Sequence, residues 1–194
     1  QKDAALRGIE LPLMPAPRHG LKVGVRRGAQ VPARYHEPMP GRYMPLTPIS
    51  TPALVRNEFG KGKALYLAGD FGEFYGEFGT KEHRRIVANA ARAFGRARVE
   101  VDGAPPSLEV AHRRKRDGSA EMIHLINYTG GMTRPIEQVV PLRGITLAVR
   151  GAKGVGEVRS LATGRKLKPA GRKRGTLTVE VPELAEYDVI VLRR

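Results

Sequence analysis

Carboxylates, aromatic rings and glycines are interleaved over ten residues, in the stretch Asp70–Gly79, which reads DFGEFYGEFG. Carboxylates accept hydrogen bonds from sugar hydroxyls, and aromatic rings cover the apolar faces of sugars. This set of residue types therefore suits carbohydrate binding, with these candidate ligand residues: Asp70, Glu73, Tyr75 and Phe78. The competing interpretation, which we favour over a ligand site, is that the rings belong to the core or to a protein interface.

The position of this stretch along the chain is also typical of a ligand site. The apolar run Lys63–Ala68 before it predicts a strand, and the residues after it predict a helix. Open α/β sheets place their ligands where the chain leaves a strand and enters a helix. We therefore expect Asp70–Gly79 to be a loop at such a junction.

The sequence predicts one helix, over residues 81–94. Thr80 is a suitable N-cap residue, and Gly95 suits the position just after the last turn. Apolar residues at helical spacing form one stripe along this segment: Ile86, Val87, Ala90, Ala91 and Phe94. A strand followed by a helix is half of a parallel βαβ unit, so the sequence indicates an incomplete α/β layer.

Nothing else in the chain assembles a self-sufficient active site. The chain has no cysteine, which excludes a thiol nucleophile, disulfides and zinc–thiolate sites. Its five histidines are scattered, and neither a GxSxG elbow nor a GxGxxG fingerprint is present. The spacing of the glutamates in the acidic stretch does not decide whether they act as a glycosidase pair. We expect no catalytic residue, no cofactor and no metal site.

The net charge of +15 is the one unusual property of the composition. It suggests nucleic acid or another anionic surface as a partner. The excess is spread along the chain, however, and the two basic clusters adjoin glycines in expected hairpin turns, where solvated charge is usual. Nucleic-acid binding is therefore the less favoured alternative, with these candidate residues: Arg113, Arg114, Lys115, Arg116, Arg172, Lys173 and Arg174.

Prolines dominate the chain before residue 53. Residues 1–20 show no periodicity and are expected to be an extended leader, whereas residues 21–25 alternate weakly, which indicates a short strand. The segment Val31–Pro52 contains six prolines and predicts a long ordered loop or an edge segment. Ala53–Phe59 then predicts a strand, joined by a glycine turn to Lys63–Ala68, which is apolar on both faces and is expected to be buried on both.

After residue 97 the pattern changes to short strands separated by turns. Leu177, Val179 and Val181 alternate with polar residues, which is typical of a strand with one face in a core. Repeated strands of this kind predict an antiparallel β-sandwich. The expected strands are 98–101, 107–113, 121–127, 145–150, 156–161, 176–181 and 187–192. Asn127–Thr129 also matches a glycosylation sequon, a tripeptide that is frequent by chance.

The segment Pro52–Phe94 resembles the end of the amidotransferase-like domain of family 42 β-galactosidases and related glycoside hydrolases, often called the trimerisation domain. The shared pattern is a strand, a G-x-G turn, a strand ending in G-D, an aromatic loop, and a helix with H-R-R and A-N-A. The matching positions are Gly60 and Gly62, Gly69-Asp70, His83–Arg85 and Ala88–Ala90. Ile123–Gly130 and Pro141–Ile145 similarly resemble two segments of the C-terminal β-sandwich of such enzymes.

The resemblance implies an α+β fold class. Residues 21–98 would be the C-terminal part of an amidotransferase-like (flavodoxin-like) α/β domain with one helix, and residues 99–194 an antiparallel β-sandwich. The early βα units of that domain and the catalytic barrel with its glutamates are missing from the sequence. The chain would therefore be a fragment or subunit from the C-terminal part of a bacterial glycoside hydrolase, without catalytic residues of its own.

The resemblance also implies partners for the chain. These are the catalytic barrel domain of the parent enzyme, further copies of the chain in a homo-trimer, and carbohydrate; no membrane partner is expected. A cytoplasmic and a secreted location remain equally open. Two alternatives to this hypothesis stay open as well: a basic nucleic-acid-binding module, and a free-standing carbohydrate-binding domain that uses Tyr75 and Phe78.

Overall fold

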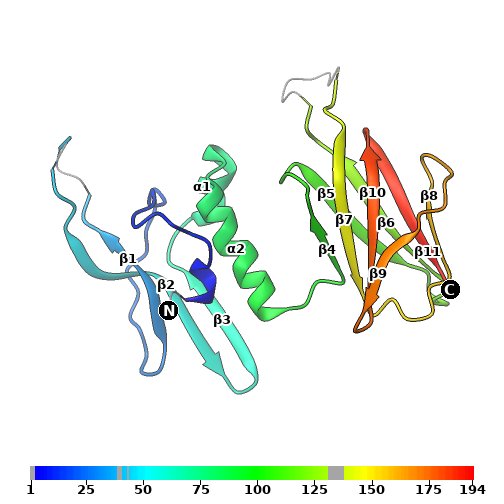
Figure 1. The fold of residues 1–194 in the computed structure, drawn as a ribbon. Helices are drawn as coiled ribbons and strands as arrows, with labels where there is room; N and C mark the ends of the chain where they lie inside the picture. The colour runs from blue at the N-terminus through cyan, green and yellow to red at the C-terminus, as the bar shows by residue number, and fades with distance from the viewer. Residues whose placement is uncertain (1–2, 39–40, 43, 131–137) are drawn as a thin grey trace. The chain divides into compact units, whose positions relative to one another are not determined.

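The computed structural model describes residues 3–38, 41–42, 44–130 and 138–194. The chain divides into two compact units, unit 1 at residues 1–96 and unit 2 at residues 97–194 (Figure 1). Within the described residues, unit 1 holds three strands and two α-helices, and unit 2 is built from strands. The expected α+β class is confirmed.

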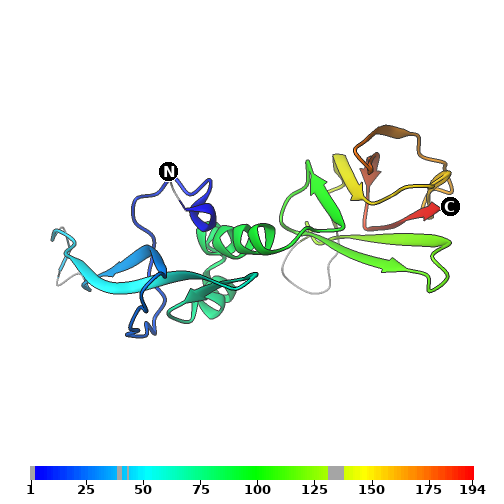
Figure 2. The same cartoon turned by 90° about the horizontal axis from the view of Figure 1, so that it is seen from below.

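Unit 1 contains one three-stranded antiparallel sheet. Its strands are β1 (Gln30–His36), β2 (Pro48–Phe59) and β3 (Gly62–Leu67), and β2 lies in the middle. Gly60, with φ 56°, makes the tight turn of the β2–β3 hairpin, which projects below the helices in Figure 1; Figure 2 shows the same unit from below. The glycine turn and the two strands that it joins are where the sequence predicts them.

The structure decides between the two alternatives for the segment 31–52, which was expected to be a long ordered loop or an edge segment. β1 is an edge strand, and it pairs with the start of β2 in irregular register; residues 39–40 and 43 of that segment lie outside the described residues. The strand β3 was expected to be buried on both faces, yet it is an edge strand and Tyr66 is half-exposed. Residues 21–25, expected as a strand, are irregular.

Two helices follow the sheet, α1 (Phe71–Phe78) and α2 (Lys81–Phe94). The bounds of α2 confirm the prediction, but α1 replaces the expected loop. Gly95 has φ −139°, so it is extended and does not end α2 in a left-handed conformation. The left-handed residue is Gly79, which ends α1 with φ 63°. No helix among the described residues is long and apolar enough to cross a membrane.

The first residues of the chain pack against α2. They contain a 3₁₀ turn, η1 (Ala4–Leu6), whose first backbone groups are capped by Asp3. The buried side chain of Asn89 on α2 donates hydrogen bonds to the carbonyls of Ala5 and Arg7, at 3.0 and 2.8 Å. These bonds attach the predicted leader to the helix face, because each satisfies a backbone acceptor that would otherwise be unpaired.

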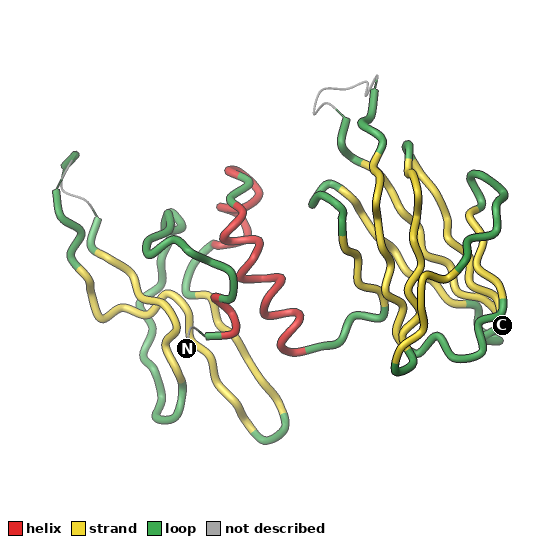
Figure 3. The backbone as a smooth tube through the Cα atoms, in the orientation of Figure 1, coloured by secondary structure: helices red, strands yellow, loops and turns green. Residues whose placement is uncertain are grey.

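Unit 2 is an antiparallel β-sandwich, as predicted, and its two layers are visible in Figure 3. One sheet has the order β4-β7-β10-β9 and the other has the order β5-β6-β11-β8. The strand bounds are β4 (Val99–Asp102), β5 (Leu108–Arg114), β6 (Ala120–Asn127), β7 (Leu142–Arg150), β8 (Glu157–Ser160), β9 (Pro169–Lys173), β10 (Thr176–Leu184) and β11 (Tyr187–Arg193). The edge strand β9 is not predicted by the sequence, because all its residues are exposed and none alternate.

The cores of the two units differ in size. Among the described residues, the main core cluster of unit 2 has 14 buried apolar residues, including Ile123, Leu147 and Ile190, whereas that of unit 1 has five: Ile9, Ala53, Leu54, Phe71 and Ile86. Burying a large aliphatic side chain contributes roughly 1.5–3 kcal/mol. Unit 2 therefore has the burial expected of an independent domain, while unit 1 leaves much of its apolar surface uncovered.

Candidate functional site

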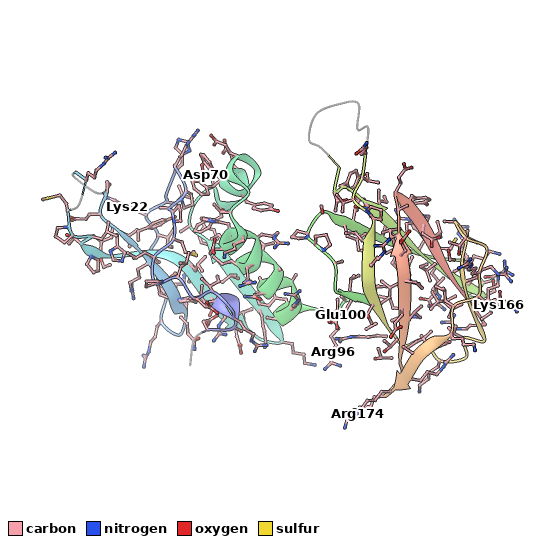
Figure 4. The ribbon with its side chains drawn as sticks, turned by 45° about the horizontal axis from the view of Figure 1, so that its top comes forward. Lys22, Asp70, Arg96, Glu100, Lys166 and Arg174 are labelled. Atoms are coloured by element: carbon pink, nitrogen blue, oxygen red, sulfur yellow. The ribbon has the colours of Figure 1, made fainter. Side chains whose placement is uncertain are left out.

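Asp70, the first candidate ligand residue, lies between β3 and α1 and contacts the proline-rich segment before β1. Its Oδ1 accepts a hydrogen bond from the backbone N–H of His19 at 3.2 Å, and its Oδ2 lies 3.0 Å from Nδ1 of the His19 ring. The backbone N–H of Asp70 donates to the His19 carbonyl at 3.3 Å. Figure 4 labels Asp70 beside the start of α1. The two residues, far apart in sequence, are thus joined by three contacts.

The backbone around this pair is fixed by a close chain crossing. Gly69 forms an isolated antiparallel bridge with Gly20, and the Tyr35 hydroxyl donates to the Ala68 carbonyl at 2.7 Å. A Cβ on Gly69 would lie 2.8 Å from both the His19 carbonyl oxygen and the Tyr35 hydroxyl oxygen. The glycine of the G-D pair is therefore required by the approach of two chain segments.

The electrostatics of this cluster favour an ionised Asp70. The hydrogen bond from the His19 side chain lowers the pKa of Asp70, against the opposing effect of partial burial. Burial, together with the negative charge of Asp70, raises the pKa of Tyr35. Because Asp70 is the acceptor, Nδ1 of His19 carries a proton, and the side chain of His19 is 80% exposed. The arrangement presents an oriented imidazole to solvent, which can exchange hydrogen bonds with a hydroxyl.

The aromatic residues of α1 belong to two groups. Phe71 is buried, and Phe74 stacks against the buried His83 and against Phe78, with ring centroids 4.8 and 4.6 Å apart. Tyr75 and Phe78 remain exposed, at 37% and 51%. The interpretation of the rings as core residues thus holds for Phe71, while Phe74 is half-buried against His83 and the two candidates for stacking on a sugar reach the surface.

Arg18 occupies part of this surface. Its guanidinium lies 5.6 Å from the centroid of the Phe78 ring and donates a hydrogen bond of 2.6 Å to Glu77. Together with His19, it brings the segment before β1 onto α1. Sequence reasoning missed both residues, because nothing in their types or spacing indicates a contact with a helix more than fifty residues away.

The helix separates the four candidates. Tyr75 and Phe78 are three positions apart and share a face, but Glu73 and Tyr75 are two positions apart and point in different directions. Glu73 is exposed in the first turn of α1. Among the described residues, Glu73, Tyr75 and Phe78 have no hydrogen bond to Asp70, whose partner is His19. Among the described residues, the structure thus joins Asp70 to His19, and it places Tyr75 and Phe78 on an exposed face of α1 and Glu73 on a different one.

His83 of the H-R-R motif is a structural residue. It is 1% exposed, contacts Phe71 and Phe74, and its Nδ1 lies 2.8 Å from the Thr80 hydroxyl. Burial lowers the pKa of His83 against the opposing effects of the Glu82 charge and the Pro15 carbonyl, so the ring is neutral at neutral pH. Within the described ranges, no three His, Cys, Asp or Glu side chains gather in a way that could hold a metal ion.

An apolar groove runs along unit 1 between the proline-rich segments and the sheet. It has a volume of about 1000 Å³. Its lining includes Leu11, Leu13, Met14, Tyr35, Ile49 and Leu54. Leu11 and Leu13 are about half exposed, at 50% and 44%. These two leucines therefore expose apolar surface at the wall of the groove.

The two basic clusters of the nucleic-acid alternative lie on hairpins of unit 2. Arg113 and Arg114 end β5, and Lys115 and Arg116 form the turn that follows. In the other hairpin, Arg174 stands at the tip with φ 49°, labelled in Figure 4, and Lys173 is exposed beside it. Arg172 donates hydrogen bonds to the carbonyls of Ala152 and Val155. The candidates are thus exposed, but Arg172 also has a structural role.

A buried ion cluster in the same unit was not predicted. The carboxylate of Glu121, 1% exposed, accepts hydrogen bonds from Arg98 at 3.0 Å and Arg194 at 2.7 Å, and Nε2 of His112 lies 2.9 Å away. Burial raises the pKa of Glu121, but the hydrogen bonds from Arg98 and His112 and the Arg98 charge outweigh it, so the pKa lies below its usual value. The cluster satisfies a carboxylate that points into the end of the sandwich.

The N-Y-T-G motif is a structural clamp. The side-chain amide of Asn127, 4% exposed, donates to the carbonyls of Val140 and Ala185 at 2.8 and 2.6 Å. Its Oδ1 accepts from the Thr129 backbone N–H and hydroxyl, at 3.0 and 2.6 Å. Both amide hydrogens are used inside the fold, so the sequon cannot accept a glycan in the folded chain.

Comparison with known proteins gives a likeness in structure only. No family model matches the chain, and no curated protein matches it in sequence. Among solved structures, α-L-fucosidase isoenzyme 2 from Paenibacillus thiaminolyticus is similar, with a TM-score of 0.64 and 16% identity over 85% of this chain. A cycloisomaltooligosaccharide glucanotransferase from Paenibacillus sp., complexed with cycloisomaltoheptaose, has a TM-score of 0.40 and 11% identity, and covers 56% of this chain and 20% of its own.

The likeness to the fucosidase concerns the fold. It extends over most of both units, but the chain spans only 27% of the fucosidase. The fold of this chain is therefore the fold of one part of a glycoside hydrolase, and membership of family 42 is not established by it. The likeness to the glucanotransferase, with a TM-score of 0.40, does not establish a shared fold.

Proposed function

We propose that this chain is the non-catalytic C-terminal region of a bacterial glycoside hydrolase similar to the β-galactosidases, and that it supports a catalytic barrel domain. The observation that carries this proposal is the apolar groove of unit 1. The order of the sequence motifs from Pro52 to Ile145 supports it, as does the likeness in fold to part of an α-L-fucosidase.

The groove needs an occupant for a physical reason. A compact domain of about a hundred residues buries well over half of the surface of its unfolded chain. Unit 1 has five buried residues in its core and leaves Leu11, Leu13 and Leu21 about half exposed. Covering such side chains removes apolar area from water, at roughly 25 cal/mol per Å². A protein surface of the parent enzyme, from the barrel domain or from a neighbouring copy in a trimer, would supply that cover.

Asp70, His19, Tyr75 and Phe78 would form one wall of the carbohydrate site of the barrel. The imidazole of His19 is oriented by Asp70 and exposed, so it can bond a sugar hydroxyl, and the exposed rings can cover an apolar sugar face. The site would be completed by the barrel, which carries the catalytic acids. In this division of roles, the catalytic carboxylates would lie in the barrel and not in this chain.

Activity measurements on the purified chain test the non-catalytic role. We expect no hydrolysis of aryl β-galactosides or aryl α-L-fucosides at any pH. Turnover that disappears in the Asp70→Ala or His19→Ala variant would overturn the proposal, because it would place a complete active site in this chain. Turnover unchanged in both variants would point to a contaminating enzyme.

The supporting role is tested by measuring whether the chain associates with a barrel domain or with further copies of itself. The purified chain should bind a recombinant barrel domain of a similar enzyme, or form trimers, as measured by light scattering after size-exclusion chromatography. The double variant Leu11→Asp with Leu13→Asp should lose this association. Leu161→Asp, at a leucine of unit 2 that is 53% exposed, is the matched control and should keep it. Equal behaviour of the two variants would contradict a docking role for the groove.

A further inference from the structure

Unit 2 gathers both basic clusters and other cations at one end of the sandwich. Arg194, after β11, donates hydrogen bonds to the carbonyl of Gly118 in the β5–β6 turn and, at 3.2 Å, to that of Lys153 in the β7–β8 loop. Ala152 of the same loop donates to the Gly175 carbonyl in the β9–β10 turn at 3.2 Å. The three connections and the end of β11 therefore form one continuous surface, at the lower end of unit 2 in Figure 1.

Most charges on this surface are free to meet a ligand. Among the described residues, none of the following exposed cations has an ion pair with a carboxylate: Arg113, Lys115, Arg116, Lys153, Lys173 and Arg174. Of the acidic groups nearby, Glu121 is paired with Arg98 and Arg194, and Glu157 is paired with Arg159. Asp117 accepts hydrogen bonds from Ser119 and keeps its negative charge beside Lys115. The exposed cations outnumber this carboxylate, so the surface carries a net positive charge that the chain does not neutralise.

The framework of this surface is rigid. Arg172 is held by two backbone carbonyls, Arg98 and Arg194 are held by the buried carboxylate of Glu121, and both hairpins belong to paired strands. Charges on such a framework lose less conformational entropy on binding than charges on a loose tail. Guanidinium groups also bind carboxylates and sulfates through two parallel hydrogen bonds.

The aromatic residues of unit 2 help to identify the ligand. This unit has two, Tyr128 and Tyr187, which follow β6 and begin β11. Since Tyr187 pairs with Ile126 and Arg193 pairs with Ala120, these rings lie at the other end of the sandwich. Among the described residues, the ring at the basic end is that of His112, which is bound to the Glu121 carboxylate; no Tyr, Phe or Trp lies there on which the bases of a single-stranded nucleic acid could stack. A polymer recognised by its anionic groups alone is the better fit.

We propose that the basic end of unit 2 binds an acidic polysaccharide, through the carboxylates or sulfates of its sugar units. This choice of polymer rests on the proposed function, because an accessory region of a glycoside hydrolase would hold the enzyme on its carbohydrate substrate. Duplex nucleic acid is the second class of polyanion, which proteins bind through its phosphates. The experiment below distinguishes it from an acidic polysaccharide.

The test uses the full chain and polygalacturonate, with heparin as the sulfated polymer, neutral galactan as the uncharged polymer and duplex DNA as the competing polyanion. Binding is measured by affinity electrophoresis or calorimetry over a series of salt concentrations. We expect binding to polygalacturonate or heparin that weakens steeply with salt and no charge-dependent binding to galactan. Tighter binding to DNA than to either acidic polysaccharide at the same salt concentration would overturn the proposal, as would no binding to either at low salt.

A matched pair of variants locates the site. The first variant is Arg116→Gln, Lys173→Gln and Arg174→Gln, at the basic end. The second is Arg165→Gln, Lys166→Gln and Lys168→Gln, which removes the same charge from the exposed loop after β8; Figure 4 labels Lys166 far from Arg174. We expect the first variant to lose about tenfold or more in affinity at low salt, since each lost contact reduces the number of counterions that binding releases.

The second variant should bind nearly as well as the unchanged chain. Equal losses in both would show a response to net charge and would overturn a defined site. Circular dichroism of each variant establishes that it is folded. Because the isolated chain is used, this result is independent of barrel association: polysaccharide binding without any association would leave the site standing and remove only the proposed supporting role.

Discussion

Nδ1 of His19 lies 3.0 Å from Oδ2 of Asp70, and this contact joins the proline-rich beginning of the chain to the junction of β3 and α1. The pair gives the G-D motif a physical meaning. Gly69 lets two segments approach closely, and Asp70 orients an exposed imidazole with its carboxylate. A motif that reads as the end of a strand is thus also the attachment point of a distant segment.

The first prediction concerns the pH dependence of unit 1. The pKa of Asp70 is lowered by its hydrogen bond with His19, so the ionised carboxylate is stabilised in the folded state. Its contribution is fully present above the unfolded pKa of about 4 and is lost as the pH falls through the lower folded pKa. Asp70→Asn should therefore destabilise unit 1 at neutral pH, and its difference from the unchanged chain should disappear in strong acid.

Urea denaturation followed by helical circular dichroism measures this effect, because the described helices lie in unit 1 and the chain has no tryptophan. Glu73→Gln is the matched control, because Glu73 is exposed on α1 and its substitution by Gln removes the same charge. The control should show a much smaller change. If Asp70→Asn and Glu73→Gln follow the same pH profile, the His19 contact contributes nothing to folding.

The second prediction compares two glycines that are three residues apart. Gly69→Ala would place a Cβ 2.8 Å from the His19 carbonyl and from the Tyr35 hydroxyl, so the crossing segments must move. We expect a loss of about 1–3 kcal/mol in the free energy of unfolding of unit 1. Gly72→Ala, in α1, meets no atom within 4 Å. It should stabilise the helix by up to about 1 kcal/mol. Two effects of the same sign would contradict the crossing geometry.

The sequence predicted the strands of unit 2 well, because one-sided burial produces their alternation: Leu177, Val179 and Val181 face the core. It also predicted the bounds of α2, but not its buried face. That face consists of His83, Ile86 and Asn89, whereas Val87 and Phe94 of the expected apolar stripe are 55% and 44% exposed. The edge strand β9 was missed for the opposite reason. None of its residues is buried, so its pairing leaves no trace in the hydrophobic pattern.

The helix α1 was missed because its local preferences oppose it. Gly72 and Gly76 lie inside it, and glycine in a helix costs about 1 kcal/mol relative to alanine. The helix is stabilised by tertiary contacts: Phe71 is buried, and Phe74 stacks between Phe78 and His83. Contacts of this kind cannot be read from spacing. The same limit applies to the site, where Asp70 was predicted from its position but His19 was not.

The third prediction concerns Asn127. Asn127→Asp keeps the shape of the side chain but removes the two donors that satisfy the Val140 and Ala185 carbonyls. Losing both hydrogen bonds and placing a carboxylate at a position that is 4% exposed should cost about 2–3 kcal/mol in the free energy of unfolding of unit 2. Thermal unfolding followed by far-ultraviolet circular dichroism measures it. Thr129→Ser, which retains the hydroxyl that bonds Asn127, is the control and should be close to the unchanged chain.

The same clamp predicts the outcome of expression in a host that glycosylates sequons. The folded chain should keep an unmodified Asn127, because its amide is buried and both hydrogens are used. Intact mass spectrometry reads this directly. A glycan on Asn127 of folded, monodisperse protein would show that the clamp opens.

The fourth prediction concerns the buried carboxylate of Glu121. Glu121→Gln keeps the volume but leaves Arg98 and Arg194 without their anion, and breaking a buried ion pair in this way costs about 3 kcal/mol. The cluster lowers the pKa of Glu121, so its stabilisation is present above the unfolded pKa and is lost as the pH falls through the folded one. The difference between the two chains should therefore vanish in acid.

A double-mutant cycle with Arg98→Gln isolates the interaction between the two residues, because Arg98 donates from two nitrogens to the two oxygens of Glu121. Losses that simply add would show that the pair does not interact energetically. Glu109→Gln, at an exposed position on β5, is the matched control.

Arg98 and Arg194 frame the basic end of unit 2, so Glu121→Gln should also weaken polygalacturonate binding. The loss of affinity should be smaller than that of the triple variant of Arg116, Lys173 and Arg174. Glu121→Gln removes a support of the surface, whereas the triple variant removes the charges that contact the polymer.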